Sequence, residues 1–321
     1  MRIEIRRWYW RLVGLALVAG AVVTFLSFLG RVWWPLELLS HFRVQYLAGL
    51  AALALLYLLG RRWPGLALAG LLAGLNLLPV GPLLPGRAVA QAAAELPRPG
   101  PTLRLVSMNA YWQNTDGTLA AQYVAETAPD VVLVVEARSR LLADLRAALP
   151  EYAYVYGHAS DHDPAGIVLL SRQPLAEVQE LYLNEADRPA IMARLWLGDR
   201  PVTLIGVHPT IPLGAGRQER RNATLAALGA WVAAQPEEVI VIGDLNISPW
   251  SPYFADLLHV GGLQDGRVGF GIYPTWPTPL PLLQIPIDHA LVTSGLQVTH
   301  FASGPGIGSD HRPIVVDVAG R

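Results

Sequence analysis

The sequence predicts two parts of different fold class: three membrane-spanning helices and, after them, an α/β domain of roughly 220 residues. Long apolar runs with almost no charge fill the first 86 residues. After residue 103, short β-branched runs alternate with amphipathic helical stretches, which is typical of an α/β domain. Polar residues stand at the ends of several apolar strands, and this indicates where the function resides.

Composition separates the same two parts. The 321 residues are 52% hydrophobic and 15% charged, more apolar than an ordinary soluble protein. All 24 basic residues are arginine. Through Gly100, ten arginines and three acids give a net charge of +7, and beyond it fourteen arginines and 22 acids give a net charge of −8. The chain has no cysteine, which excludes disulfides, a thiolate nucleophile and a zinc–thiolate site.

Residues 12–30, 44–60 and 63–86 are the three predicted membrane spans. Each approaches the ~20 residues that cross a hydrocarbon core of ~30 Å. A cleaved signal peptide is the alternative for the first run, but two further runs follow it without an intervening cleavage-like site. Core helices of a soluble protein are the alternative for all three, but they would leave no polar face for water.

Arginine placement predicts the orientation of these spans. Four arginines precede the first span, and Arg61 and Arg62 follow the second, so both groups lie on one side of a three-span arrangement. By the positive-inside rule this side is cytoplasmic. We therefore expect a multi-pass protein of the cell membrane, with a cytoplasmic N-terminus and everything after residue 86 outside the cytoplasm.

The chain is accordingly divided into a membrane domain (1–86), an Ala/Pro-rich, semi-rigid linker (87–102) and an α/β domain (103–321). Apolar β-branched runs predict the strands of that last domain, at 103–108, 131–135, 167–170, 191–197, 202–207, 239–242, 289–293 and 314–318. Amphipathic stretches predict its helices, at 119–127, 141–149 and 218–234.

Polar side chains follow many of these strands. Asp244 and Asn246 come after the strand at 239–242, and because strand side chains alternate, both project from one side. The other strand ends lead into Asn109, Glu136, His208, Asp288, Asp310 and His311. Turns and helix caps can explain each residue alone. Their recurrence at strand ends, where α/β folds bind ligands, favours one shared site.

Seven segments carry these residues in an order that resembles the endonuclease/exonuclease/phosphatase superfamily of DNase I-like proteins, and the N-terminus resembles that of membrane-anchored bacterial members. The segments are SMNAYWQN (107–114), PDVVLVVEAR (129–138), GIVLLSRQPL (166–175), LIGVHPT (204–210), VIVIGDLNISP (239–249), TWPTPLPLLQIPIDHALVT (275–293) and GSDHRPIVVDV (308–318). The resemblance implies a four-layer α/β/β/α sandwich, in which two packed sheets are flanked by helices.

The resemblance also implies a hydrolase of phosphodiester or phosphomonoester bonds that uses Mg²⁺, with Mn²⁺ as a second choice. Asn109 and Glu136, with Asp310 nearby, would form the metal site, which suits the oxygen ligands of a hard cation. Asp244 would orient or deprotonate the attacking water, and Asn246 and His208 would donate to phosphate oxygens. Asp288 would hold His311 in one tautomer. Whether Asp244 or His311 takes the proton stays open.

Two departures from the family pattern bear on the substrate. Some nuclease members carry a second acid two residues after the asparagine, where this chain has Tyr111, which is closer to the lipid and phosphatase branches. The acidic partner that His208 has in parts of the family is also missing from the motif. Asp161 or Asp163 is a candidate for that role, although a solvated loop is the simpler interpretation.

Arg217, Arg220 and Arg221 open the helix at 218–234 on one face and could bind a phosphate-bearing group, or simply face solvent beside Glu219. Trp276 is a further candidate substrate contact. The net charge of −8 beyond Gly100 argues against a broad electropositive groove for duplex DNA. Expected substrates are a phospholipid or its head group, an inositol phosphate, or extracytoplasmic nucleic acid. The rival hypothesis is a non-catalytic relative that binds a phosphorylated ligand or a partner.

Overall fold

The computed structural model describes residues 2–86 and 100–321, so most of the predicted linker 87–102 lies outside the described residues. Two compact units divide the chain. One comprises Met1–Pro82 with Trp250–Pro252, and the other Leu83–Pro249 with Tyr253–Arg321.

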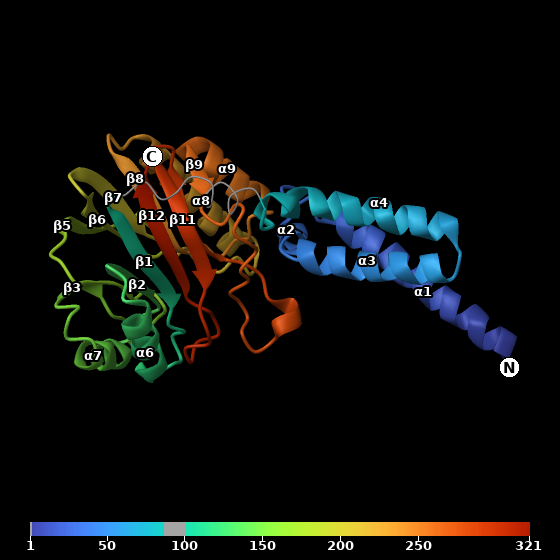
Figure 1. The fold of residues 1–321 in the computed structure, drawn as a ribbon, viewed down its shortest axis with the longest axis horizontal. Coiled ribbons are helices and arrows are strands. Elements are labelled where there is room, and N and C mark those ends of the chain that lie inside the picture. Colours follow the sequence, from blue (N-terminus) through green and yellow to red (C-terminus); the bar gives the residue numbers. More distant parts are fainter. Residues whose placement is uncertain (1, 87–99) are drawn as a thin grey trace. The chain divides into compact units, whose positions relative to one another are not determined.

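The first unit is helical (Figure 1, blue to cyan). It contains α1 (Arg2–Leu26), α2 (Trp34–Ser40), α3 (Arg43–Leu59), α4 (Trp63–Val80) and the 3₁₀ turn η1 (Gly81–Leu83). By length and composition, Glu4–Leu26 and Trp63–Leu83 could each cross a membrane, and α2 with α3 form a pair bent by 62° that would be a third span if the pair acts as one. The three-span prediction thus becomes two or three helices, because α3 alone has only 17 residues.

Polar side chains join the three long helices inside this unit. Arg43 of α3 donates from Nη1 to Asn76 Oδ1 of α4 at 3.2 Å, and Asn76 Nδ2 donates to Thr24 Oγ1 of α1 at 2.9 Å. All three residues are buried. Hydrogen bonding between them satisfies groups that would be costly to leave unpaired in an apolar surrounding.

Two six-stranded sheets form the second unit. The strand order of the first sheet is β11 (Leu296–Ser303), β12 (Ile314–Gly320), β1 (Thr102–Asn109), β2 (Val131–Val135), β4 (Ile167–Ser171) and β3 (Tyr154–His158). The order of the second is β5 (Ala176–Leu181), β6 (Ala190–Leu197), β7 (Arg200–Gly206), β8 (Glu238–Asp244), β10 (Asp288–Thr293) and β9 (Leu263–Asp265).

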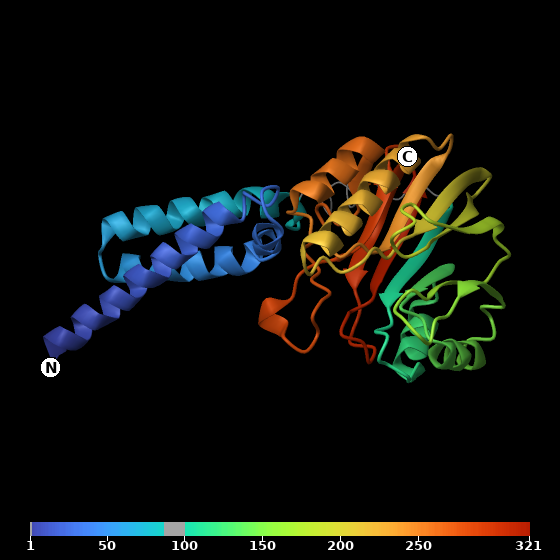
Figure 2. The same cartoon turned by 180° about the vertical axis from the view of Figure 1, so that it is seen from behind.

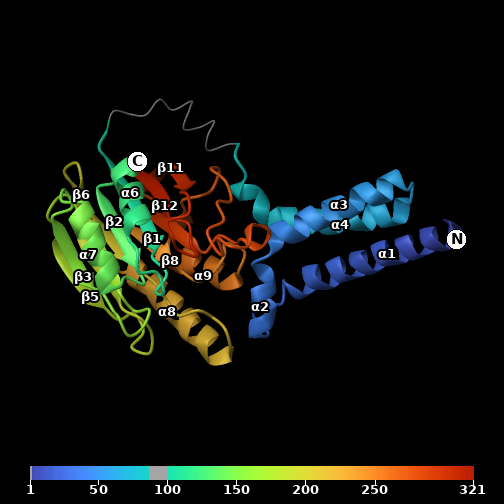
Figure 3. The same cartoon turned by 90° about the horizontal axis from the view of Figure 1, so that it is seen from below.

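Helices cover the outer face of each sheet. Figures 1 and 3 show α6 (Thr118–Thr127) and α7 (Ser139–Ala148) on the first sheet, and Figure 2 shows α8 (Ala215–Ala233) and α9 (Pro252–Gly261) against the second. Strand β2 explains the layering, since Leu133 faces the core between the sheets while Val132 and Val134 pack toward the α6–α7 side. The predicted four-layer α/β/β/α sandwich is confirmed.

The elements that the sequence did not predict are mostly at the edges. Strands β3, β5 and β11 are end strands of their sheets, and their side chains are largely exposed or half-buried. Such strands lack the continuous apolar runs that identify buried ones. The predicted central strands agree with the structure to within two residues at either end.

Candidate active site

Strand pairing brings the predicted polar residues together. In the parallel pair β1–β2, Asn109 lies opposite Val135, so Glu136 follows directly beside it. In the parallel pair β7–β8, Gly206 lies opposite Ile242, which places His208 level with Asp244 two residues further along. Asp244 and Asp288 are direct partners in the antiparallel pair β8–β10. The strand register therefore delivers residues from both sheets to one end of the sandwich.

Asn109 is the centre of this arrangement. Its Nδ2 donates to Glu136 Oε1 at 3.2 Å and to Asp244 Oδ2 at 3.1 Å, and lies 3.5 Å from His311 Nε2. Its Oδ1 accepts the Tyr111 N–H at 2.9 Å, so the amide nitrogen rather than the oxygen faces the carboxylates. As it stands, Asn109 is a donor that bridges the two acids, which differs from the predicted role as an oxygen ligand for metal.

The backbone is strained at Glu136 and in the turn that follows Asp244. Glu136 and Asn246 both have left-handed φ values, of 56° and 50°, which non-glycine residues rarely adopt. Gly243, with φ 142°, is required because a Cβ there would lie 2.1 Å from Val207 O. Such conformations cluster at functional sites, where surrounding bonds hold them in place. Here the Trp112 N–H donates to Glu136 Oε2 at 2.8 Å and fixes that carboxylate.

Asp288 and His311 form a buried, oriented pair. His311 Nδ1 lies 2.9 Å from Asp288 Oδ2, and Nε2 lies 3.6 Å from Asp244 Oδ2. Burial disfavours the imidazolium, but the charges of Asp288 and Asp244 outweigh it and raise the pKa of His311 to about 9. Ser309 Oγ, which donates to Asn109 O at 2.7 Å and accepts the His311 N–H at 3.0 Å, ties the pair to the end of β1.

Asp244 is the most perturbed acid of the group. Burial raises its pKa to about 7, with His311 opposing the change and Asp288 adding to it. Its Oδ1 accepts the Asn246 N–H at 2.9 Å, which leaves Oδ2 facing Asn109, His208 and His311. A carboxylate with this pKa can take up or release a proton near neutral pH.

Arg188, which the sequence analysis missed, is the partner of His208. Its Nη1 lies 2.9 Å from His208 Nδ1 and 2.7 Å from Nε2. Burial, with the charges of Arg188 and His311, holds the pKa of His208 well below its usual range, so the imidazole is neutral. His208 Nε2 also lies 3.5 Å from Glu136 Oε1 and 3.6 Å from Asp244 Oδ2.

The two acids proposed as partners of His208 are engaged elsewhere. Asp161 contacts Arg138 and accepts the Ser139 N–H, and Asp163 accepts from Ser160 Oγ and the Ala165 N–H. They hold the loop between β3 and β4, as the simpler interpretation expected. No sequence signal marks Arg188, because it precedes β6 rather than ending a strand.

The three arginines of α8 are in different environments. Arg217 and Arg220 are exposed, whereas Arg221 is completely buried and donates from Nη1 to Asn246 O at 2.7 Å. Arg221 thus supports the strained turn after β8 and is not available to a phosphate group, contrary to the prediction for it. Asn246 is held further by its Nδ2, which donates to Pro209 O at 3.0 Å.

Trp276 and Asp310 are joined at the rim of the site. Trp276 Nε1 donates to Asp310 Oδ2 at 3.0 Å, and the Trp276 ring lies 6.3 Å from that of His311. The indole therefore holds the Asp310 carboxylate next to the catalytic histidine candidate. Both residues are half-buried, so a ligand can reach them.

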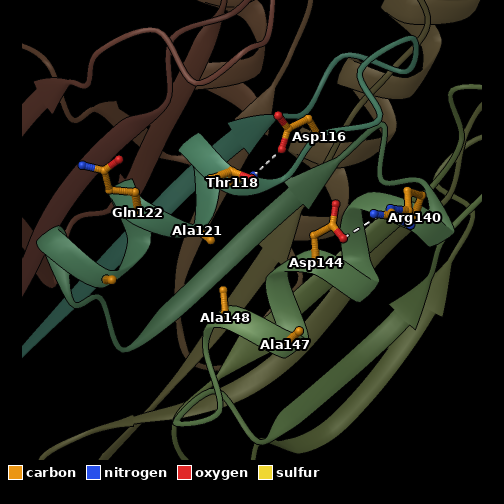
Figure 4. Close-up of a pocket in the computed structure, with 9 residues that line it drawn as sticks. Asp116, Thr118, Ala121, Gln122, Arg140, Asp144, Ala147 and Ala148 are labelled. Atoms are coloured by element: carbon orange, nitrogen blue, oxygen red, sulfur yellow. Dashed lines mark hydrogen bonds and ion pairs between the residues drawn. The ribbon is translucent and has the colours of Figure 1, made fainter.

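Two surface hollows differ in what they offer. One is lined by Arg188, Arg220, Thr210, Asp163 and Asp187, so it adjoins the partner of His208. The other, shown in Figure 4, lies between α6 and α7 and has Asp116 accepting the Thr118 N–H and Arg140 paired with Asp144 at 3.3 Å. Of these two, only the first contains a residue, Arg188, that contacts the strand-end cluster, which comprises Asn109, Glu136, His208, Asp244, Asp288 and His311.

The donor set fits a divalent cation. Glu136 Oε1 and Asp244 Oδ2 converge on the same Asn109 nitrogen, which concentrates negative charge at one point and offers oxygen ligands. Asp244, Asp288 and His311 also place ligand atoms within 4.8 Å of one another. We attribute this second grouping to the His311–Asp288 hydrogen bond, because a cation at Nδ1 would displace its proton. Glu136 with Asp244 is the better candidate for metal.

A model of the Endonuclease/Exonuclease/phosphatase family matches residues 106–311, which contain Asn109, Glu136, His208, Asp244, Asp288 and His311. The chain belongs to this family. Comparison with curated protein sequences finds no match.

Solved structures agree with the family in fold. A D. rerio TDP2 humanised by 14 mutations aligns with a TM-score of 0.57 and 18% identity, covering 68% of this chain and 98% of that one. A family member from Bacteroides vulgatus gives 0.57 and 17%, covering 68% and 99%. Sphingomyelinase C from Streptomyces griseocarneus gives 0.52 and 19%, covering 68% and 99%. At these identities the comparisons establish the DNase I-like fold.

Proposed function

We propose that this family member is a membrane-anchored, divalent-metal-dependent phosphoesterase, with attack of water in line with the leaving oxygen. One observation supports it above the others: Glu136, Asp244 and His311 lie within hydrogen-bonding range of the Asn109 amide, and His208 lies within 3.6 Å of the same two acids. A binding protein would need donors for a phosphate but not two buried acids beside them, since buried like charges are costly. This favours catalysis over the non-catalytic alternative.

Geometry favours Asp244 over His311 as the base in this proposal. His311 is held as an imidazolium by Asp288, so it suits stabilising negative charge or donating a proton to the leaving oxygen. Asp244 Oδ2, which faces Asn109 and the two histidines, would accept a proton from water, while its Oδ1 is fixed by the Asn246 N–H. Neutral His208 and the Asn246 amide are the candidate donors to the phosphate oxygens, and the Arg188 guanidinium adds positive charge beside them.

Glu136 would coordinate the metal, with Asp310 at the rim, and Asp244 would contribute its negative charge beside the cation while its Oδ2 acts as the base. When bound, a divalent cation polarises a phosphoryl oxygen and lowers the pKa of a coordinated water. Mg²⁺ suits the carboxylate set, and Mn²⁺ accepts the same ligands. Asn109 would then act through its amide nitrogen as an orienting donor.

The test uses full-length protein in detergent and the soluble diester bis(p-nitrophenyl) phosphate. We expect turnover that requires Mg²⁺ or Mn²⁺ and is abolished by EDTA. Asp244→Ala and His311→Ala should each lower the rate roughly 100-fold or more, as for loss of a proton-transfer group. His300→Ala is the matched control, since His300 is exposed on β11. Equal rates in all four proteins would refute the catalytic assignment.

A further inference from the structure

Two loops beside the candidate site carry exposed apolar side chains. One follows His208 toward α8, and the other runs from Trp276 through the 3₁₀ turn η2 (Pro281–Leu283). Their exposed members, termed the apolar rim, are Ile211, Leu213, Leu280, Leu282 and Leu283. Figures 1 and 2 show the second loop, in orange, projecting away from the sheets.

The exposure of the apolar rim is unusual. Leu282 is 88% exposed, more than any other large hydrophobic side chain among the described residues, including those on the N-terminal helices. Single exposed apolar residues are common, but a group of them near a functional site marks an interaction surface. A monomer in water gains nothing from this arrangement, because each leucine would be more stable if buried.

The loops also lack charge. Residues 268–287 and 209–216 contain no Asp, Glu, Lys or Arg, in a chain that is 15% charged. A protein partner of ordinary composition is usually met by a rim of polar and charged groups around the apolar contact. Leucine, isoleucine and proline without charges suit lipid acyl chains better.

Hydrogen bonds fasten both loops to the catalytic candidates. Thr278 N–H donates to Asp310 O at 2.8 Å, and Trp276 Nε1 donates to the Asp310 carboxylate. The first loop begins at Pro209, whose carbonyl accepts from Asn246. A surface that binds the apolar rim is therefore held next to the strand-end cluster.

The same chain contains helices that can anchor it in a membrane. Glu4–Leu26 and Trp63–Leu83 can cross a bilayer by length and composition. Because a polypeptide reaches at most ~3.5 Å per residue, the covalent chain limits the separation of Gly86 and Gly100 to roughly 50 Å. A bilayer surface is thus the apolar phase that this chain can meet at all times.

We propose that the apolar rim inserts into the lipid surface and that the substrate is the phosphoester of a membrane lipid, taken by the site from the bilayer. This rests on the proposed phosphoesterase function and adds its substrate class. The lipid's acyl chains stay in the bilayer beside the apolar rim, while its phosphate enters between Arg188, His208 and Asn246.

The absence of cysteine allows a direct test of insertion. Full-length Leu282→Cys, labelled with an environment-sensitive fluorophore, is reconstituted into phosphatidylcholine vesicles with brominated acyl chains. Asp199→Cys is the control, because this exposed residue lies in the turn before β7 while His208 follows the other end of that strand. We expect quenching at position 282 but not at 199. Equal quenching at both positions, or none at 282, would overturn insertion.

Turnover separates the two proposals. Leu282→Asp/Leu283→Asp should leave hydrolysis of bis(p-nitrophenyl) phosphate unchanged and lower head-group release roughly tenfold or more in phosphatidylcholine vesicles containing sphingomyelin and phosphatidylinositol. Equal loss on both substrates, or loss on neither, would overturn the role of the rim. Absence of soluble-diester turnover in the unsubstituted protein would instead refute the proposed function, while the quenching result would stand on its own.

Discussion

At the scale of single residues, the candidate site is built by burial and charge compensation. Glu136, Asp244 and Asp288 are buried acids, and Arg188 and His311 are the cations that face them. Burial lowers the pKa of Arg188, but the nearby acids oppose this and an arginine stays charged. Arg188 thus adds its charge to the burial that keeps His208 neutral, and in the proposed function its remaining N–H groups would face a ligand.

We predict that Arg188→Met lowers kcat/KM for the soluble diester roughly 10- to 100-fold, because a charge-assisted donor beside the phosphate is lost. The variant should also let His208 take up a proton more readily, which raises the apparent pKa of the acidic limb of the pH–rate profile. Steady-state kinetics between pH 5 and pH 8 measure both effects.

Arg217→Met is the control for this substitution, since Arg217 is exposed on the first turn of α8 and does not line the hollow that contains Arg188. Arg220→Met, in that hollow, should raise KM with little change in kcat. If Arg217→Met and Arg188→Met reduce activity alike, Arg188 has no specific role.

At the scale of elements, a buried network fixes β10 against the turn after β8. His289 Nε2 donates to Ile247 O at 2.7 Å, and Nδ1 lies 3.2 Å from Arg267 Nη1. Arg267, completely buried, also donates to the Asp288 carbonyl. The network thus positions the strand that carries Asp288, although none of its members faces the strand-end cluster through its own side chain.

This network predicts an acid-sensitive fold. Burial and the neighbouring Arg267 hold the pKa of His289 well below its usual range, so folding requires the neutral imidazole. The unfolded chain takes up a proton as pH falls below ~6.5, and stability that is complete above this pH is then lost by up to ~1.4 kcal/mol per pH unit. Thermal unfolding at pH 7, 6 and 5 measures the loss.

His289→Gln identifies the group responsible. Glutamine can keep the donor to Ile247 O but does not titrate, so the variant should be less stable at pH 7 and have a shallower pH dependence. His208, also buried and neutral, contributes to the slope in both proteins. An unchanged slope in His289→Gln would assign the acid sensitivity elsewhere.

At the scale of the whole molecule, the sequence predicts what repeats along the chain and misses what only folding brings together. Central strands such as β2 and β8 are buried on both faces and read as continuous apolar runs, and this identifies both the sheets and their polar ends. Edge strand β5 and residue Arg188 have no such mark. Likewise, three arginines at helical spacing look equivalent in sequence, but packing against Asn246 buries Arg221 alone.

The whole molecule also bears a stability cost for its site, and this yields opposite predictions for two neighbouring aspartates. In metal-free protein at pH 8, folding disfavours ionised Asp244, because its pKa is raised to about 7 by burial. Asp244→Asn should therefore stabilise the protein by roughly 1–3 kcal/mol while abolishing turnover. Asp288→Asn should destabilise it by a similar amount, because buried His311 loses its charged partner. Unfolding in EDTA measures the stability change of both variants. Mn²⁺ should raise the melting temperature of the unsubstituted protein but not of Asp244→Asn, since binding needs the charges of both Glu136 and Asp244. A destabilised Asp244→Asn that still responds to Mn²⁺ would show that Asp244 neither strains the fold nor holds the cation.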